Sequence, residues 1–243
     1  MTPQEIEART DLTAALRSAS RLGLGEGICN HFSLALPGAP GHFLINPQGL
    51  HWSEITPGDL VVVDAQGRKV SGKHSVEPTA FFIHSAIHRA SDRAHCVMHT
   101  HTTAGVAVAC LQNGLMQTNF YSAQLHNMVA YHDFEGITIH AEEGPRVLKS
   151  IGTKQAVILR NHGLLSWGST VPETFAILWT LQRACEIQLA TFSMGPAITV
   201  SDDIAARCTR DSLQFDVNHG GAGQDVFDAL VRQVDRLDAS YRQ

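Results

Sequence analysis

Two histidines that are one residue apart stand at the end of an apolar segment of the sequence. In HCVMHTHTTAG these are His99 and His101. Residues i and i+2 of a β-strand project to the same face, so the two imidazoles can converge on one ion. Ring nitrogens of histidine bind zinc at about 2.0 to 2.1 Å. Taken alone, such a pair is more often two hydrogen-bonded, partly buried side chains, so a metal site needs a third ligand.

The tripeptide Asn-His-Gly occurs twice and offers two candidates for that third ligand. His162 follows the apolar segment QAVILR, which predicts a strand with a polar tip, and Gly163 allows the backbone to approach an ion closely. His219 lies in DVNHGGAGQ, a glycine-rich linker between two helical segments, and is expected to be an exposed loop residue. Strand ends next to helix starts are where open α/β sheets place ligands. The predicted metal ligands are therefore His99, His101 and His162.

The composition excludes several classes of protein. The 243 residues carry a net charge of -5, and the scattered Lys and Arg residues form no basic stripe, so no nucleic-acid partner is expected. No apolar segment approaches the roughly 18 residues of a membrane span, and the N-terminus lacks the layout of a signal peptide. No membrane association is expected, and the expected location is cytoplasmic. The five cysteines include no Cys-x-x-Cys pair, which argues against disulfides and against a thiolate zinc site.

A single domain of residues 1–243 is predicted, because no Pro/Ser-rich linker or low-complexity segment divides the chain. Its core covers about residues 8–200, and a helical extension covers about residues 200–243. The stretch 113–135 is long and mixed in character, which is typical of a functional loop. With 44% apolar residues, the chain can bury a substantial core.

Helix and strand signals alternate along this domain. Thr2, Pro3 and Glu5 have the types expected at a helix start, and Gly152 and Gly195 have the type expected after a helix end. Strands are predicted at residues 42–46, 59–64, 68–70, 95–99, 136–140, 155–160 and 163–168. Helices are predicted at residues 3–22, 78–90, 102–111, 144–151, 172–194 and from about 223 onward. The first three strands are expected to form an antiparallel meander, and helices are expected to cover both faces of the sheet.

Four blocks of sequence together resemble the class II aldolase/adducin family from roughly residue 8 to residue 200. In chain order they are GLGEGICNHFS, INPQGLHWSEITPGDLVVVD, TAFFIHSAIHRASDRAHCVMHTHTTAG and VILRNHGLLSWG. The resemblance implies an α/β fold, a three-layer α/β/α sandwich with a mixed, largely antiparallel central sheet. It also implies a homotetramer with active sites near subunit interfaces and one divalent metal ion on the three histidines. Zn²⁺ is the expected ion, with Fe, Mn, Co or Ni as alternatives, and adducin-head-like bacterial members are the more similar branch.

The chain departs from the sugar-phosphate aldolases of this family at the start of the helix before the two histidines. Where those enzymes have a catalytic Glu, this sequence has Ala80, and Glu77 is the nearest carboxylate that can substitute for it. The alternative is that Glu77 only caps the helix. Pro78 and Thr79 match a pair of serines that bind phosphate, and only the threonine can donate a hydrogen bond. Asn30 matches the family's substrate-binding Asn, so a phosphorylated substrate is disfavoured rather than excluded.

Three further side chains are candidates for the substrate site. Family members place a tyrosine of the adjacent subunit near the metal, and Tyr121 is the nearest match to it. His126, in the same irregular stretch, can share that position, so either residue is a candidate proton donor. Arg160, two residues before a predicted ligand, can hold a substrate carboxylate in a bidentate manner or pair with a neighbouring acid.

A metal on three histidines keeps open coordination positions, where a Lewis acid can stabilise an enolate as a bond breaks. Retro-aldol cleavage, decarboxylation, epimerisation and dehydration all need this stabilisation. Since decarboxylation forms the carbanion without prior proton abstraction, the absence of the family Glu favours it. The predicted function is a metal-dependent carbon-carbon lyase, of the decarboxylase or aldolase type, for a small hydroxy or oxo acid. The alternatives are a non-haem iron oxygenase, a sugar-phosphate aldolase or epimerase, and a non-enzymatic adducin-like assembly module.

Overall fold

The structure, a computed structural model, describes residues 1–137, 142–214 and 221–242, without the side chains of residues 78–81, 213 and 214. The helices are α1 (Pro3–Arg21), α2 (Pro78–Ala90), α3 (Thr103–Ala109), α4 (Phe120–Gln124), α5 (Glu143–Ile151), α6 (Val171–Phe192), α7 (Asp202–Gln214), α8 (Gln224–Asp238) and the 3-10 turn η1 (Ala239–Arg242). The strands are β1 (Phe32–Ala35), β2 (His42–Ile45), β3 (Val61–Asp64), β4 (Lys69–Ser71), β5 (Cys96–Thr100), β6 (Val129–His132), β7 (Ala156–Leu159) and β8 (Gly163–Gly168).

The strands form one sheet in the order β4-β3-β2-β1-β5-β8-β7-β6. The pair β6 and β7 is parallel, and every other neighbouring pair among the described strands is antiparallel. The predicted meander is therefore confirmed, and it continues into β1. The mixed, largely antiparallel central sheet that the sequence predicts is confirmed as well.

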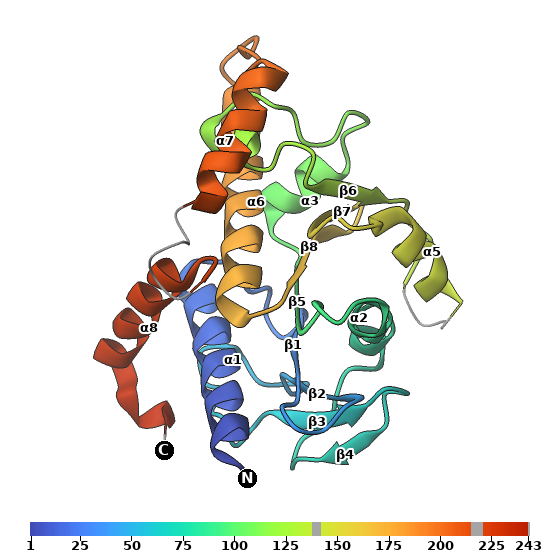
Figure 1. The fold of residues 1–243 in the computed structure, drawn as a ribbon, viewed down its shortest axis with the longest axis vertical. Coiled ribbons are helices and arrows are strands. Elements are labelled where there is room, and N and C mark those ends of the chain that lie inside the picture. Colours follow the sequence, from blue (N-terminus) through green and yellow to red (C-terminus); the bar gives the residue numbers. More distant parts are fainter. Residues whose placement is uncertain (138–141, 215–220, 243) are drawn as a thin grey trace.

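Helices cover both faces of this sheet, which makes three layers (Figure 1). On one face, α1, α3 and α6 pack against β1, β5 and β8, and the largest apolar cluster lies between them. On the other face, α2 packs on β5, α5 packs on β6, and the two helices contact each other over a second cluster. The predicted α/β/α sandwich is confirmed. Among the described residues, every helix is too short or too polar to cross a bilayer.

Local capping explains where several helices begin and end. The Thr2 side chain accepts a hydrogen bond from the backbone N–H of Glu5 at 3.2 Å, which satisfies a donor that the first turn of α1 leaves without a partner. Gly152 ends α5 with φ 57°, a left-handed conformation that glycine adopts without a side-chain clash. Pro78 begins α2, as the sequence predicts, since its missing N–H costs nothing in the first turn.

Some elements differ from the prediction. The stretch 113–135, expected as an irregular loop, contains α4 and β6. Asn119 caps the start of α4, because its Oδ1 accepts hydrogen bonds from the backbone N–H groups of Tyr121 and Ser122 at 3.0 Å each. The predicted strand 136–140 falls largely outside the described residues, and its first two residues form a bend. The helix α7 precedes the final helix and was missing from the predicted set.

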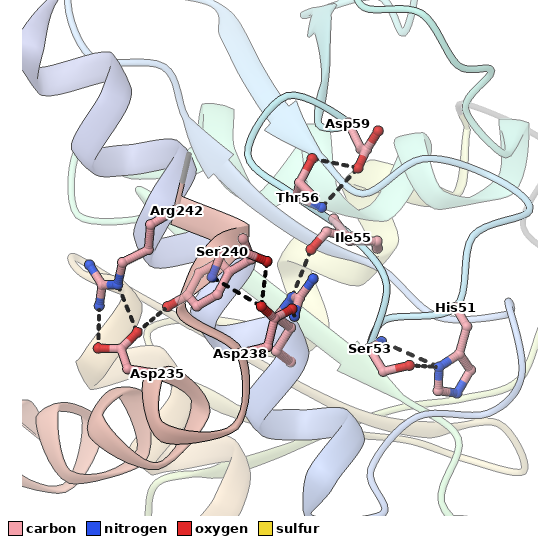
Figure 2. A network of polar contacts seen from close by, with 11 residues as sticks. His51, Ser53, Ile55, Thr56, Asp59, Asp235, Asp238, Ser240 and Arg242 are labelled. Atoms are coloured by element: carbon pink, nitrogen blue, oxygen red, sulfur yellow. Dashed lines mark hydrogen bonds and ion pairs between the residues drawn. The ribbon is translucent and has the colours of Figure 1, made fainter.

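The C-terminal helix α8 packs against α1 and α6. Arg17 of α1 donates hydrogen bonds to the carbonyl of Ile55 at 2.9 Å and to Asp238 at 3.0 Å, so it joins three parts of the chain. Figure 2 shows Asp238 and Ser240 beside Ile55 in this network. Tyr241 is 1% exposed and lies under the Arg17 guanidinium, 4.8 Å from it. The last residues are thus anchored to α1.

Candidate metal centre

The three predicted metal ligands come together at one end of two adjacent strands. β5 pairs with β8 so that Thr100 lies opposite Leu164, which puts His101 after one strand next to His162 before the other. The ring centroids of His99, His101 and His162 are 4.5, 4.8 and 4.8 Å apart. One nitrogen from each ring lies within 4.8 Å of the other two. The sequence pattern therefore predicts this cluster correctly, whereas metal binding itself stays a prediction.

A tight turn brings His162 to this position. Asn161 has φ 56° and donates its N–H to the carbonyl of Ala109 at 3.1 Å, so the chain reverses between β7 and β8. At Gly163 a Cβ atom would lie 2.4 Å from the carbonyl oxygen of Thr100. A side chain at this position would push the two strands apart. Glycine is therefore required for the close approach of the strands that carry the histidines.

The hydrogen bonds of His99 and His101 determine which ring nitrogens are free. His99 Nδ1 lies 2.8 Å from the carbonyl oxygen of Leu164, which only accepts, so Nδ1 carries the proton. His101 Nδ1 likewise faces the carboxylate of Glu26 at 3.1 Å. Both Nε2 atoms of the neutral rings therefore present lone pairs, and they are only 2.7 Å apart. These lone pairs repel each other at this distance, and a metal ion that binds both nitrogens would relieve the repulsion, so the donor set fits a bound metal ion.

Burial keeps these imidazoles in the neutral form that binds metals. Desolvation, reinforced by the two neighbouring rings, lowers the pKa of His99 well below 6.5. Desolvation and the neighbouring His101 lower the pKa of His162 to about 4. The pKa of His101 is also lowered by desolvation, against the opposing effect of Glu26. The neutral state that metal coordination requires is thus the ordinary state of the triad at neutral pH.

A cavity of about 570 Å³ opens in front of the triad. This is a size that admits a small organic molecule. Phe134 and Ile137 form its mouth and are 52% and 76% exposed. Its described lining consists of Glu26, Cys29, His31, Glu77, Ile83, His84, His99, His101, Phe134, Gly136, Ile137, Asn161, His162 and Leu165.

Three predicted site residues lie at or near this cavity. Glu77 is the N-cap residue of α2 and lines the cavity, and its Oε2 is 2.7 Å from His31 Nε2. Asn30 is 1% exposed, and both polar atoms of its side chain have no hydrogen-bond partner in the described part of the chain. Thr79 belongs to the first turn of α2, but its side chain lies outside the described residues. Their roles in binding or catalysis stay predictions.

The other three predicted residues do not line this cavity within the described chain. Tyr121 packs edge-on against Trp179, with ring centroids 5.6 Å apart. His126 Nδ1 donates a hydrogen bond to Gln117 Oε1 at 2.6 Å, and His126 lines a separate cavity of about 230 Å³. Arg160 donates to two backbone carbonyls after α3, at 3.1 and 3.3 Å. One chain alone thus keeps these three side chains away from the triad.

Several other histidines have a structural role. His88 Nδ1 donates to the carbonyl of Ala94 at 2.6 Å, so its Nε2 accepts from the Ser33 hydroxyl at 2.8 Å. The same Ser33 oxygen accepts from His84 Nδ1 at 2.7 Å. Desolvation lowers the pKa of His88 to about 4 and that of His84 well below 6.5. This chain of hydrogen bonds ties α2 to β1 without any charge.

Sequence reasoning missed three residues of the cavity. Glu26 orients a predicted ligand, His31 pairs with Glu77, and Phe134 forms the mouth. Glu26 and His31 do lie in the glycine-punctuated block GLGEGICNHFS, which carried part of the family resemblance. Their contacts join residues far apart in the chain, and one sequence without a fold gives no signal for such pairs.

The amino-acid sequence matches the family of the class II aldolase and adducin N-terminal domain over residues 10–189. The chain belongs to this family. A protein of Pseudomonas aeruginosa that is named for aldolase class 2 is 37% identical over 98% of this chain and 93% of its own length. Alpha-adducin of Rattus norvegicus is also 37% identical, over 94% of this chain and 33% of the adducin. Proteins named for aldolase class 2 and adducins are thus both relatives of this chain.

Solved structures of family members share the fold. An aldolase II superfamily protein from Pseudomonas syringae superimposes with a TM-score of 0.94 at 36% identity, covering 100% of this chain and 98% of that chain. L-fuculose 1-phosphate aldolase from Glaciozyma antarctica PI12 superimposes with a TM-score of 0.87 at 26% identity, covering 98% of this chain and 92% of that chain. The fold of this chain is therefore that of these class II aldolase family members.

Proposed function

We propose that this class II aldolase family member is a metal-dependent lyase that cleaves a carbon-carbon bond of a small hydroxy or oxo acid. Decarboxylation and retro-aldol cleavage are the two reactions included. The observation that carries the proposal is the cluster of His99, His101 and His162 in the lining of a cavity of about 570 Å³, with the Nε2 atoms of His99 and His101 2.7 Å apart. His99, His101 and His162 would hold one divalent ion, for which Zn²⁺ is the expected identity.

The bound ion would supply Lewis-acid chemistry, stabilising the negative charge that develops on substrate oxygens as the bond breaks. The protein must then hold the substrate and manage one proton. Glu77 is the carboxylate proposed for the proton, since its Oε2 lies in the cavity 2.7 Å from His31 Nε2. Ala80, at the position of the family Glu, has no group that can carry a proton. A carboxylate paired with an imidazole can hold a proton on either partner.

A homotetramer would bring further residues to each site. Tyr121 and His126 are proposed to act as proton donors in the cavity of an adjacent subunit, because they lie away from the cavity of their own chain. Phe120 next to Tyr121 is 69% exposed, which supports a protein contact at α4. Asn30, Thr79 and Arg160 are proposed as substrate-binding residues. Mass measurement by light scattering during size-exclusion chromatography tests the assembly.

Metal analysis tests the centre itself. The anaerobically purified protein should contain about one divalent ion per chain, and His162→Ala should lose it. His51→Ala is the matched control, because His51 is an exposed histidine that does not line the cavity. Full metal occupancy in His162→Ala would refute the proposed centre. Bound iron would favour the non-haem iron oxygenase alternative.

The reaction is tested on the metal-loaded protein with a panel of hydroxy and oxo acids. A lyase releases CO₂ or an aldehyde from the acid without consuming O₂, whereas an oxygenase consumes O₂ when substrate is added. Cleavage of sugar phosphates in place of acids would support the sugar-phosphate aldolase alternative. Metal occupancy without turnover of any of these compounds would refute the lyase and favour an adducin-like assembly role.

A further inference from the structure

The cavity in front of the triad has an apolar wall that reaches the solvent. Phe134 and Ile137 line it although they are 52% and 76% exposed. Large apolar side chains that are exposed to solvent next to a candidate metal centre indicate a surface that a ligand covers. The Phe134 ring lies 6.2 Å from the His162 ring at an angle of 70°, so it borders the triad directly. Ile83 and Leu165, both buried, continue this wall towards the floor.

The charged side chains of the cavity are carboxylates. Glu26 and Glu77 both line it, whereas none of its described lining residues is Lys or Arg. Each carboxylate faces an imidazole of the cavity, His101 at 3.1 Å and His31 at 2.7 Å. Glu77 also occupies the N-cap of α2, a helix end that otherwise attracts anions. A phosphate group at the tail of a substrate would meet this negative charge, and no Lys or Arg among the described lining residues could bind it.

We propose that this cavity selects an unphosphorylated substrate whose tail is apolar, preferably an aromatic ring, and lies against Phe134 and Ile137. The oxygen atoms at the other end of the substrate face the three histidines. The proposal rests on the proposed function, because a metal ion on the triad must bind those oxygen atoms. Contact with Phe134 removes apolar surface of both partners from water and adds a favourable ring-ring arrangement. The carboxylate of such a substrate would be one of the groups that bind the ion.

A series of hydroxamates tests this inference without any turnover. Each compound chelates a metal ion through the same two oxygen atoms, while the tail is a methyl group, a phenyl ring or a phosphate ester. Binding to the metal-loaded protein is measured by titration calorimetry. We expect the phenyl compound to bind about tenfold more tightly than the methyl compound, which corresponds to about 1.4 kcal/mol. The phosphate compound should bind no more tightly than the methyl compound.

Two variants assign that preference to the proposed wall. Phe134→Ala should remove most of the tenfold phenyl advantage and leave the methyl compound unchanged. Phe192→Ala is the control, because Phe192 is 42% exposed on α6 and does not line the cavity. Tightest binding of the phosphate compound, or an unchanged phenyl advantage in Phe134→Ala, would refute the substrate class while leaving the metal centre intact. A protein that takes up no metal ion refutes the proposed function, and the substrate class fails with it.

Discussion

Gly163 is the position where a single methyl group should disturb the candidate centre most directly. A Cβ atom built at this residue lies 2.4 Å from the Thr100 carbonyl oxygen, 3.0 Å from His101 Cδ2 and 3.3 Å from His99 Cε1. A Cβ atom closer than 3.0 Å to a backbone atom forces a shift, so β5 and β8 must part. The carbon also touches both rings whose Nε2 atoms face each other. Gly163→Ala should therefore change stability and metal binding together.

The cost in stability can be bounded. Overpacking of a close-packed interior costs about 1 to 3 kcal/mol, and the lower backbone entropy of unfolded alanine offsets about 0.4 to 1 kcal/mol of that. A net loss of up to about 2.6 kcal/mol in the free energy of unfolding lowers the Tm of a chain of this length by up to about 10 °C. Loss of ring orientation should reduce metal affinity by about tenfold to a hundredfold, the range for disturbed ligand support.

Thermal unfolding of the metal-free protein and competition with a chromophoric chelator measure the two effects separately. Gly58→Ala is the matched control, because its Cβ atom would meet nothing closer than Thr56 Oγ1 at 3.9 Å. The control should keep its metal affinity and lose no stability. A folded Gly163→Ala protein with wild-type metal affinity would refute the argument that the close approach of the strands positions the ligands.

Other residues give independent tests. Glu26→Ala removes the carboxylate that orients His101, so metal affinity should fall about tenfold to a hundredfold, and an unchanged affinity would contradict that role. Burial raises the pKa of the Asp11 carboxyl to about 6. Between about pH 4 and pH 6 the carboxyl therefore keeps its proton in the folded protein but has lost it in the unfolded chain. The free energy of unfolding consequently falls as the pH rises through 6. Asp11→Asn should raise the free energy of unfolding by about 1 kcal/mol at pH 7, after allowance for solvent screening, and should leave it unchanged at pH 4. Urea unfolding measures both values, and an equal increase at the two pH values would contradict the prediction. Tyr241→Ala should lower the free energy of unfolding by about 3 kcal/mol and the Tm by about 6 to 12 °C. Met194 is 86% exposed, so Met194→Ala should not change the Tm. A small decrease in the Tm of Tyr241→Ala would mean that the C-terminal turn is not anchored.

Much of the fold could be predicted from the sequence because its signals are local. Residues 78–90 were predicted as a helix and form α2 with the same bounds, since Pro78 begins it and an apolar stripe follows. The short helix α4 could not be predicted, because five residues are less than two turns and show no period. The helix α7 did have a usable signal, with Asp202 and Asp203 in its first turn.

The sequence likewise predicts one part of the candidate site but not another. The triad could be predicted because each histidine stands at or just after the end of an apolar strand, and strand ends gather at one edge of a sheet. Arg160 shows the limit of that reasoning. It stands two residues before His162, but β7 ends at Leu159 and the left-handed Asn161 reverses the chain between them. The guanidinium therefore reaches the carbonyls after α3 and lies 4.6 Å from the Tyr131 ring.

The absence of a Glu at Ala80 affects the choice between the two proposed reactions. In one chain, the nearest carboxylate to that position that lines the cavity is Glu77, one helical turn earlier and already 2.7 Å from His31 Nε2. In the proposed mechanism, decarboxylation would need a proton only after the carbon-carbon bond has broken, and the pair of Glu77 and His31 would deliver it. We therefore propose decarboxylation ahead of retro-aldol cleavage.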